Sequence, residues 1–362
     1  MSRIKYSLFI LIGWTLGLSI ALVSLELFLR MIDLDKWFTA ENLGSGGHGI
    51  LHNSRIEYPI SDLYQYSDTK VIYTRNEYGL RDNCVDPSKI KLITIGGSTT
   101  DQRYLNFEDT YQYVLQETIE NYLNDEYCVS NAGYDGHSSS AHVYLLEEMF
   151  PQMIPSLNPE IVLLYVGIND APIYYLNVFE PPAPFKKELK KLKIVQQLIP
   201  LWRFIQSLRT QKYEGFGGHH PASYEVNDYT VSHFNPEIKL LEKLAVTRFR
   251  ANMKKILTAI DKMNAKAICV TQPHQYITQK GGVDYAVPNV LKEGVSGLDY
   301  DFLLRAINTE IISLCGYDNT IDLYAKKFEK AFFYDGVHTT PKGANFIGKQ
   351  LASEIILRGY VE

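Results

Sequence analysis

The sequence lacks the features that mark several large classes of protein. It has four cysteines among 362 residues, and no two of them are spaced as Cys-x-x-Cys, so zinc-binding and thioredoxin-type chemistry have no support. Its formal net charge is −5, which gives no electrostatic reason to expect a nucleic-acid partner. Internal repeats and low-complexity blocks are absent from the sequence. We expect neither a metal nor another cofactor.

The positions of the four cysteines predict no particular disulfide pairing. Cys128 and Cys269 fall inside apolar, strand-like runs, where the simplest interpretation is a small buried hydrophobic side chain. Nothing in the spacing of Cys84 and Cys315 pairs them with these two, so the sequence leaves open whether a disulfide forms outside the cytosol.

The N-terminal segment has a run without charge, from Tyr6 to Leu25. Twenty residues of helix rise about 30 Å, the thickness of the hydrocarbon core of a bilayer, which predicts one transmembrane helix. Arg3 and Lys5 precede the run, so the positive-inside rule places the N-terminus in the cytoplasm and the rest of the chain outside it. A cleaved signal peptide, with Ser19-Ile20-Ala21 as its small-residue site, is the alternative.

We divide the chain into three parts. Residues 1–30 are the cytoplasmic stub and anchor, residues 31–81 a linker and N-terminal arm, and residues 82–362 the main domain. Residues 171–236 are too long for an ordinary connection and form an insertion. It has four open interpretations: a lid, a partner surface, a membrane-surface helix, or an amphipathic helix packed on the domain.

Five short apolar runs in the main domain alternate with segments of helical spacing. The predicted strands are 92–95, 127–130, 161–166, 267–270 and 320–323, and the predicted helices include 111–123, 246–263, 302–314 and 344–356. This alternation predicts an α/β fold of three layers, α/β/α, with a five-stranded parallel sheet between helices.

The first of these strands ends at a candidate nucleophile. Gly96 and Gly97 terminate it, and Ser98 follows where the chain leaves the sheet. Ligands of open α/β sheets bind at the carboxyl ends of the strands, which is where a nucleophilic serine belongs. The stretch has no P-loop spacing, and Thr100 replaces the closing glycine of Gly-x-Ser-x-Gly, which argues against an α/β-hydrolase.

Four further residues are candidates for the same site. His338 has an aspartate, Asp335, three positions earlier, a spacing that lets the carboxylate orient one ring nitrogen while the other faces the serine. Asn169 follows an apolar strand and offers a side-chain amide, while Gly136 follows another and offers a bare backbone N–H. Each also has an ordinary explanation: a turn aspartate, a surface histidine, a helix N-cap and a turn glycine.

The ordered set resembles the SGNH hydrolases, also called the GDSL lipase/esterase family. The four stretches that carry the resemblance are Gly96-Gly-Ser-Thr-Thr100, Asn131-Ala-Gly-Tyr-Asp-Gly136, Gly167-Ile-Asn-Asp170 and Asp335-Gly-Val-His338. The resemblance implies a flavodoxin-like three-layer fold and a triad of Ser98, Asp335 and His338. It also implies an oxyanion hole formed by the Ser98 and Gly136 N–H groups and the Asn169 side chain.

The stretch around Ser98 departs from the family pattern. Gly97-Ser98-Thr99 replaces the Asp-Ser-Leu of the family name. Together with the preceding Asn76-x-x-Gly-Leu-Arg-Asp82 and the N-terminal anchor, this resembles the membrane-anchored bacterial branch. The implied function is a serine esterase that removes or transfers O-acyl groups, expected to be O-acetyl, on an extracytoplasmic carbohydrate.

Three alternatives stay open. The first is an O-acetyltransferase of polysaccharide modification served by a membrane acyl-donor partner, and the second is a phospholipid or lipid esterase that uses the basic segment Lys186–Arg209. The third is a catalytically silent, membrane-tethered glycan-binding protein. The sequence assigns no substrate-binding residue and no oligomeric state, although Arg103, Tyr104 and Gln272 are placed to line a pocket. The remaining histidines read as loop or surface residues: His137, His142, His219, His220 and His274.

Overall fold

The computed structural model describes residues 3–31, 52–171 and 238–361, with isolated positions 230 and 235 and short gaps at 62, 66, 85, 281–282, 289 and 291–294. The chain divides into two compact units, one of residues 1–47 with 178–214 and the other of residues 48–177 with 215–362. The predicted insertion therefore falls almost wholly outside the described residues.

The predicted membrane anchor falls on helix α1 (Arg3–Met31), in the first unit. Side chains of this helix are described for residues 13–28. Within the described part of the chain, no helix is both long and apolar enough to span a membrane. The prediction of a transmembrane helix therefore has no support from the structure.

The second unit is built on a five-stranded sheet whose neighbouring strands all run parallel, in the order β4-β3-β5-β6-β9. Its strands are β3 (Ile90–Gly96), β4 (Cys128–Gly133), β5 (Ile161–Tyr165), β6 (Lys266–Val270) and β9 (Thr320–Ile321). Counted along the chain, this is the order 2-1-3-4-5 of flavodoxin-like sheets, whose ligand site lies between the first and third strands. The predicted fold class of this unit is confirmed.

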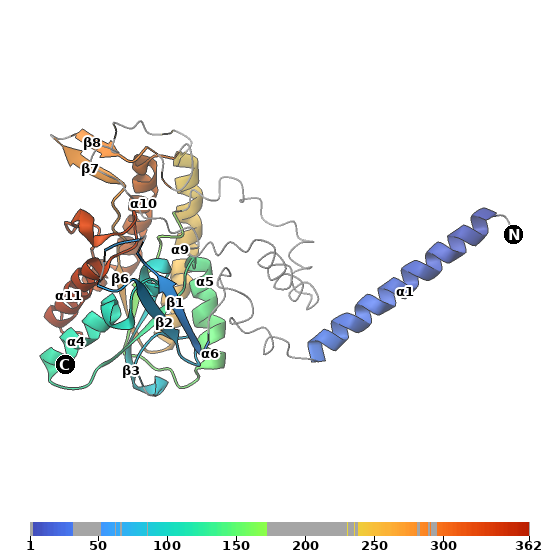
Figure 1. Cartoon of the computed structure of the whole chain (residues 1–362), viewed down its shortest axis with the longest axis horizontal. Helices are drawn as coiled ribbons and strands as arrows, with labels where there is room; N and C mark the ends of the chain where they lie inside the picture. The colour runs from blue at the N-terminus through green and yellow to red at the C-terminus, as the bar shows by residue number, and fades with distance from the viewer. Residues whose placement is uncertain are drawn as a thin grey trace. The chain divides into compact units, whose positions relative to one another are not determined.

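Helices cover both faces of the sheet (Figure 1). One face carries α4 (Tyr111–Leu123) and α11 (Pro341–Leu357), and the other carries α5 (Ser139–Tyr144), α6 (Phe150–Met153), α9 (Ile238–Lys262) and α10 (Gly297–Cys315). Successive strand residues point to opposite faces, so Leu92 packs with α4 and α11 while Ile93 packs with α9 and α10. Both faces are buried, which explains why the strands read as continuous apolar runs.

Several helices begin at residues that satisfy their free backbone N–H groups. The Thr110 hydroxyl accepts a hydrogen bond from the Tyr113 N–H at the start of α4, and Thr340 caps α11 with a proline in its first turn. Helix α10 starts with a capping box, in which Ser296 and Asp299 bond reciprocally. Short helical turns complete the connections: η2 (Pro87–Lys89), η3 (Phe107–Asp109), η4 (Leu145–Met149), η7 (Tyr317–Asn319) and η8 (Lys330–Phe332).

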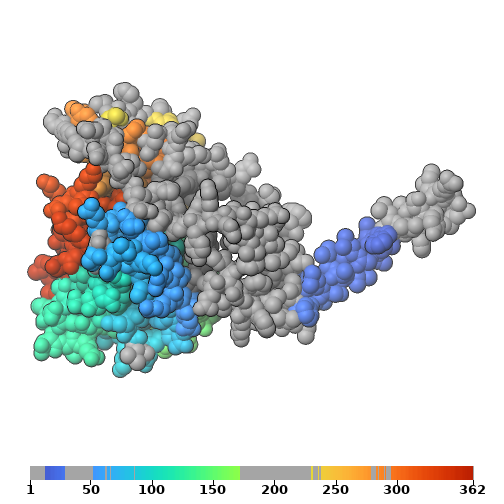
Figure 2. Space-filling model, in the orientation of Figure 1, coloured from blue at the N-terminus to red at the C-terminus, as the bar shows by residue number. Residues whose placement is uncertain are grey.

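Part of the predicted N-terminal arm is a regular hairpin that packs on the domain. Strand β1 (Ser54–Pro59) pairs antiparallel with β2 (Lys70–Arg75). Their buried Tyr58 and Tyr73 share an aromatic cluster with Tyr104 and Tyr334 from the main domain. Figure 2 shows the blue segment of this hairpin beside the red C-terminal segment. A second hairpin, β7 (Ile277–Lys280) with β8 (Val283–Ala286), follows β6.

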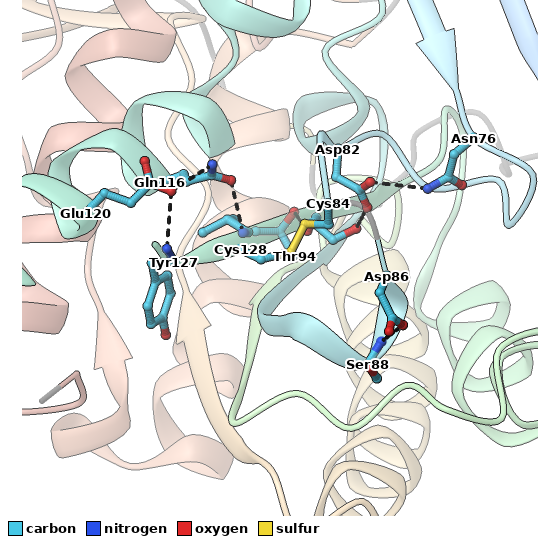
Figure 3. Close-up of a disulfide and its surroundings, with 12 residues drawn as sticks. Asn76, Asp82, Cys84, Asp86, Ser88, Thr94, Gln116, Glu120, Tyr127 and Cys128 are labelled. Carbon is cyan, nitrogen blue, oxygen red and sulfur yellow. Dashed lines mark hydrogen bonds between the residues drawn. A yellow bond between two sulfur atoms is a disulfide. The ribbon is translucent and has the colours of Figure 1, made fainter. Parts of the chain in front are cut away.

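All four cysteines are paired. Cys84 bonds Cys128 at the start of β4 (Figure 3), and Cys269 of β6 bonds Cys315 at the end of α10. The Cα atoms lie 5.9 Å and 6.4 Å apart, within the usual range for a disulfide. The sequence left open whether a disulfide forms, and the structure shows two. The paired cysteines are 44 and 46 residues apart, so spacing alone could not match them.

Candidate active site

Ser98 lies at the first position of the short helix α3 (Ser98–Asp101), directly after strand β3. Any residue other than glycine before Ser98 would displace Asn169, because a Cβ atom on Gly97 would lie 2.4 Å from Nδ2 of Asn169 and 3.2 Å from the carbonyl oxygen of His137. Three segments that are distant in the sequence thus meet at Gly97. The serine is presented at the switch point of the sheet, between the ends of β3 and β5.

The three predicted triad residues lie in one chain of hydrogen bonds. Nε2 of His338 is 2.7 Å from Oγ of Ser98, and Nδ1 of His338 is 2.6 Å from Oδ2 of Asp335. The other carboxylate oxygen of Asp335 accepts the backbone N–H groups of Val337 and His338, at 2.8 and 2.7 Å. These partners assign a proton to Nδ1, so Nε2 is left to accept the serine proton.

The environment of His338 favours its protonated form. Burial alone would lower the pKa of His338, but the charge and hydrogen bond of Asp335, together with the charges of Asp135 and Asp101, outweigh burial and raise it. The ring also stacks on Tyr334, with centroids 5.7 Å apart and planes 13° apart. Tyr334 in turn stacks on Tyr64, 5.7 Å away, so residues of the N-terminal arm support the catalytic loop.

Asn169 also reaches the nucleophile turn, and Gly136 directly precedes His137, whose carbonyl oxygen reaches that turn. Asn169 follows β5, and its Nδ2 donates one hydrogen bond to the carbonyl oxygen of His137, at 3.0 Å. A side-chain amide nitrogen carries two hydrogens, and this bond uses one of them. Gly136 has φ of 73°, a conformation that suits glycine. The structure therefore brings all five predicted site residues to the same edge of the sheet.

A buried carboxylate links the two loops that carry these donors. Asp170 accepts the backbone N–H of Ser139 at 2.8 Å and its hydroxyl at 2.5 Å. Burial raises the pKa of Asp170, although the bonds from Ser139 oppose that effect. The sequence placed Asp170 in a family stretch without giving it a role. Its contacts show that it fixes the loop after β4 to the loop after β5.

The sequence did not identify a buried ion pair behind the nucleophile. Arg75 of β2 lies 2.6 Å from Asp101 of α3, and both side chains are 1% exposed. The Arg75 guanidinium also donates to the carbonyl oxygens of Gly79 and Gly133, and the Tyr73 hydroxyl donates to Asp101 at 2.7 Å. The available signal was the alternation of Val71, Tyr73 and Arg75, which all point inward.

Two of the three positions considered for a pocket lining are buried instead. Tyr104 is 2% exposed and Gln272 is fully buried, with its backbone N–H bonded to Asn308. Arg103 keeps 16% of its side chain exposed and lies 3.4 Å from both Asp101 and Asp135.

The interpretation of five other histidines as loop or surface residues is wrong for His142, which lies in helix α5, whereas His274 does lie in a loop. His142 is fully buried, and burial lowers its pKa to about 3. The His274 side chain is 2% exposed and pairs with Asp301. His219 and His220 lie outside the described residues. Across the described ranges, no group of three or more His, Cys, Asp or Glu side chains is arranged to hold a metal ion.

Comparisons with known proteins give structural likenesses only. No family model and no curated protein matches the chain. A lipase, Lip_vut3, from a goat rumen metagenome is 14% identical, with a TM-score of 0.44, over 73% of this chain and 97% of that one. The acetyl xylan esterase AlAXEase is 17% identical, with a TM-score of 0.40, over 74% and 100%. TesA is 12% identical, with a TM-score of 0.41, over 74% and 98%. At these values the likenesses carry no inference about activity.

Proposed function

We propose that this chain is a serine ester hydrolase of the SGNH type. The observation that carries the proposal is the continuous hydrogen-bonded chain from Asp335 through His338 to Ser98. Nucleophile, base and orienting acid stand in the order that acyl transfer through a serine requires. The amide of Asn169 beside the nucleophile turn supplies the fourth part, a donor for an oxyanion.

The chemistry follows from these positions. Nε2 of His338 takes the hydroxyl proton of Ser98 as Oγ attacks the ester carbonyl, and Asp335 stabilises the imidazolium that forms. The negative charge on the former carbonyl oxygen is received by the N–H groups of Ser98 and Gly136 and by the Asn169 amide. The C–O bond of the ester then breaks, and His338 returns its proton to the leaving alcohol. Water, activated by the neutral His338, hydrolyses the acyl-enzyme.

We propose O-acetyl groups on a carbohydrate outside the cytoplasm as the substrate. The family resemblance of the four sequence stretches supports the acetyl group. The two disulfides support the location, because disulfides persist in oxidising compartments and are rare in the cytosol. Transfer to a sugar hydroxyl would use the same acyl-enzyme, with the hydroxyl in place of water.

Hydrolysis of p-nitrophenyl acetate by the full-length protein tests the proposal. We expect turnover by the wild type and its loss in Ser98→Ala and His338→Ala, with folding of each variant checked by circular dichroism. A wild type no faster than these folded variants would overturn the hydrolase proposal. Acetate release from acetylated polysaccharide, with long-chain micellar esters as the comparison, then tests the substrate. Faster cleavage of the micellar esters would favour a lipid esterase.

A further inference from the structure

A second aspartate–histidine pair lies buried next to the catalytic loop. Nε2 of His274 is 2.8 Å from Oδ1 of Asp301, and the two side chains are 2% and 3% exposed. Asp301, on α10, also accepts the Tyr324 hydroxyl at 2.5 Å and the Arg305 guanidinium at 2.7 Å. None of these residues belongs to the proposed triad, and a network of this kind requires every polar atom to be partnered.

The partners of His274 fix its tautomer. Its Nδ1 accepts the backbone N–H of Tyr276, at 3.1 Å, so Nδ1 carries no proton. The ring proton is then on Nε2 and points to Asp301. Rings of Tyr276, Tyr300 and Tyr324 surround the imidazole, with centroids 5.7 to 6.0 Å away. His274 is therefore held by Asp301 on one side and holds the Tyr276 backbone on the other.

The segment that His274 holds lies directly against the catalytic loop. A Cβ atom on Gly336 would lie 1.8 Å from Cε1 of Tyr276, so the tyrosine ring packs on the bare backbone of that glycine. The Gln275 N–H donates to the Gly336 carbonyl oxygen at 2.8 Å. Gly336 is the residue after Asp335 and is two positions before His338. Both of its contacts thus act on the turn that sets the distance between acid and base.

We infer that His274 is a positioning residue for the triad, an inference that rests on the proposed function. Asp301 orients its ring, and the Nδ1 acceptor fixes the Tyr276 backbone. The Tyr276 ring and the Gln275 N–H then hold Gly336, so that Asp335 reaches His338 in the geometry that activates Ser98. A general base works only within hydrogen-bond reach of its proton, so a small shift of this turn lowers the turnover number rather than substrate binding.

Two substitutions of His274 separate its two hydrogen bonds. In His274→Asn, the side-chain oxygen takes the place of Nδ1 and still accepts the Tyr276 N–H, while the bond to Asp301 is lost. In His274→Gln, the amide nitrogen takes the place of Nε2 and still donates to Asp301, while Tyr276 loses its acceptor. We expect His274→Gln to lower kcat at least tenfold while its KM stays within twofold of the wild-type value. His274→Asn should retain most of the wild-type kcat. His52→Gln, at an exposed histidine bonded to the Glu77 carbonyl, is the matched control.

A second readout does not depend on activity. The Nδ1 proton of His338, bonded to Asp335, is expected at low field in the proton NMR spectrum, and it should weaken or shift in His274→Gln and persist in His274→Asn. Tyr276→Leu, which removes the ring beneath Gly336, should change it in the same way. An unchanged low-field signal and kcat in His274→Gln and Tyr276→Leu would overturn the inference, as would equal losses of kcat in the Gln and Asn variants. A wild type without esterase activity would count against the proposed function, and the low-field signal would still test the positioning.

Discussion

Nε2 of His338 lies 2.7 Å from Oγ of Ser98, although the two residues are 240 positions apart in the sequence. Ser98 follows the first strand of the parallel sheet, and His338 belongs to the loop that leads into the last helix, α11. The contact therefore forms only when the C-terminal part of the chain has packed on the sheet.

Asp335→Asn should reduce kcat for p-nitrophenyl acetate by about 10³- to 10⁴-fold, because the amide no longer fixes the productive tautomer of His338. The wild-type profile of kcat/KM against pH should show an acid limb. Its midpoint should lie above the ordinary histidine pKa of about 6.5, since the fold raises the pKa of His338 and only neutral imidazole acts as base.

The same shift has a consequence for stability. A raised pKa in the folded state contributes stability below the unfolded pKa, and this contribution is lost as the pH rises through the folded pKa of His338. Glu329→Gln, at an exposed carboxylate paired with Lys342, is the control. It should change neither the dependence of kcat/KM on pH nor the dependence of stability on pH. A midpoint below about 6.5 in the wild type would contradict the account of His338.

Asn169→Ala should lower kcat by about 10²- to 10³-fold with little change in KM, because the donor acts on charge that develops in the transition state. Steady-state kinetics with a short-chain ester measure both constants. Asn252→Ala is the comparison, since that amide bonds the hydroxyls of Ser139 and Ser140 and contacts no triad residue. Equal effects of the two substitutions on kcat would remove Asn169 from the oxyanion hole.

Arg75→Met should destabilise the fold by about 3–5 kcal/mol, because it removes the closer and fully buried of the two guanidinium partners of the Asp101 carboxylate, and Arg103 lies 3.4 Å away. Adding Asp101→Asn should recover part of this loss, which urea unfolding measures. Lys70→Met removes an exposed ion pair with Glu57 and should cost less than about 1 kcal/mol. A single Arg75→Met variant as stable as Lys70→Met would show that the buried pair contributes little.

Replacing Cys269 and Cys315 together by serine should lower stability by about 2–5 kcal/mol, because the disulfide closes a loop between residues 46 positions apart in the sequence. Thermal unfolding with and without reductant measures the effect. The wild type should lose stability in reductant, whereas the same treatment should cost the double variant less. Insensitivity of the wild-type melting temperature to full reduction would contradict a structural role for both disulfides.

Much of the sheet and the site could be predicted from local sequence. Each buried parallel strand is a short apolar run, and the site residues stand where these runs end, so strand positions already place Ser98 and Asn169 at one edge. The order of strands and the loop geometry at Asp335 then follow from packing, which the resemblance anticipated. These features depend on contacts that each segment makes with the same sheet.

The features that the sequence did not reveal depend on pairs of distant segments. The Cys84–Cys128 bond and the Arg75–Asp101 pair join residues with no spacing signal between them. The alternation of Val71, Tyr73 and Arg75 in β2 is a signal for a half-buried strand, but it is short and includes a charged arginine, which local sequence does not predict to point inward. His274 was predicted to be a loop or surface residue, and its burial was missed because its partner, Asp301, lies on a helix 27 positions away.

Labelling by a fluorophosphonate tests directly whether Ser98 is an activated nucleophile, because the reagent requires an activated serine but no knowledge of the substrate. We expect one adduct per full-length chain, located at Ser98 by peptide mass spectrometry. We also expect no adduct in Ser98→Ala and labelling slowed at least about 100-fold in folded His338→Ala, which lacks the base. An unlabelled wild type, or an adduct on another residue that persists in Ser98→Ala, would contradict the assignment of Ser98 as a nucleophile activated by His338.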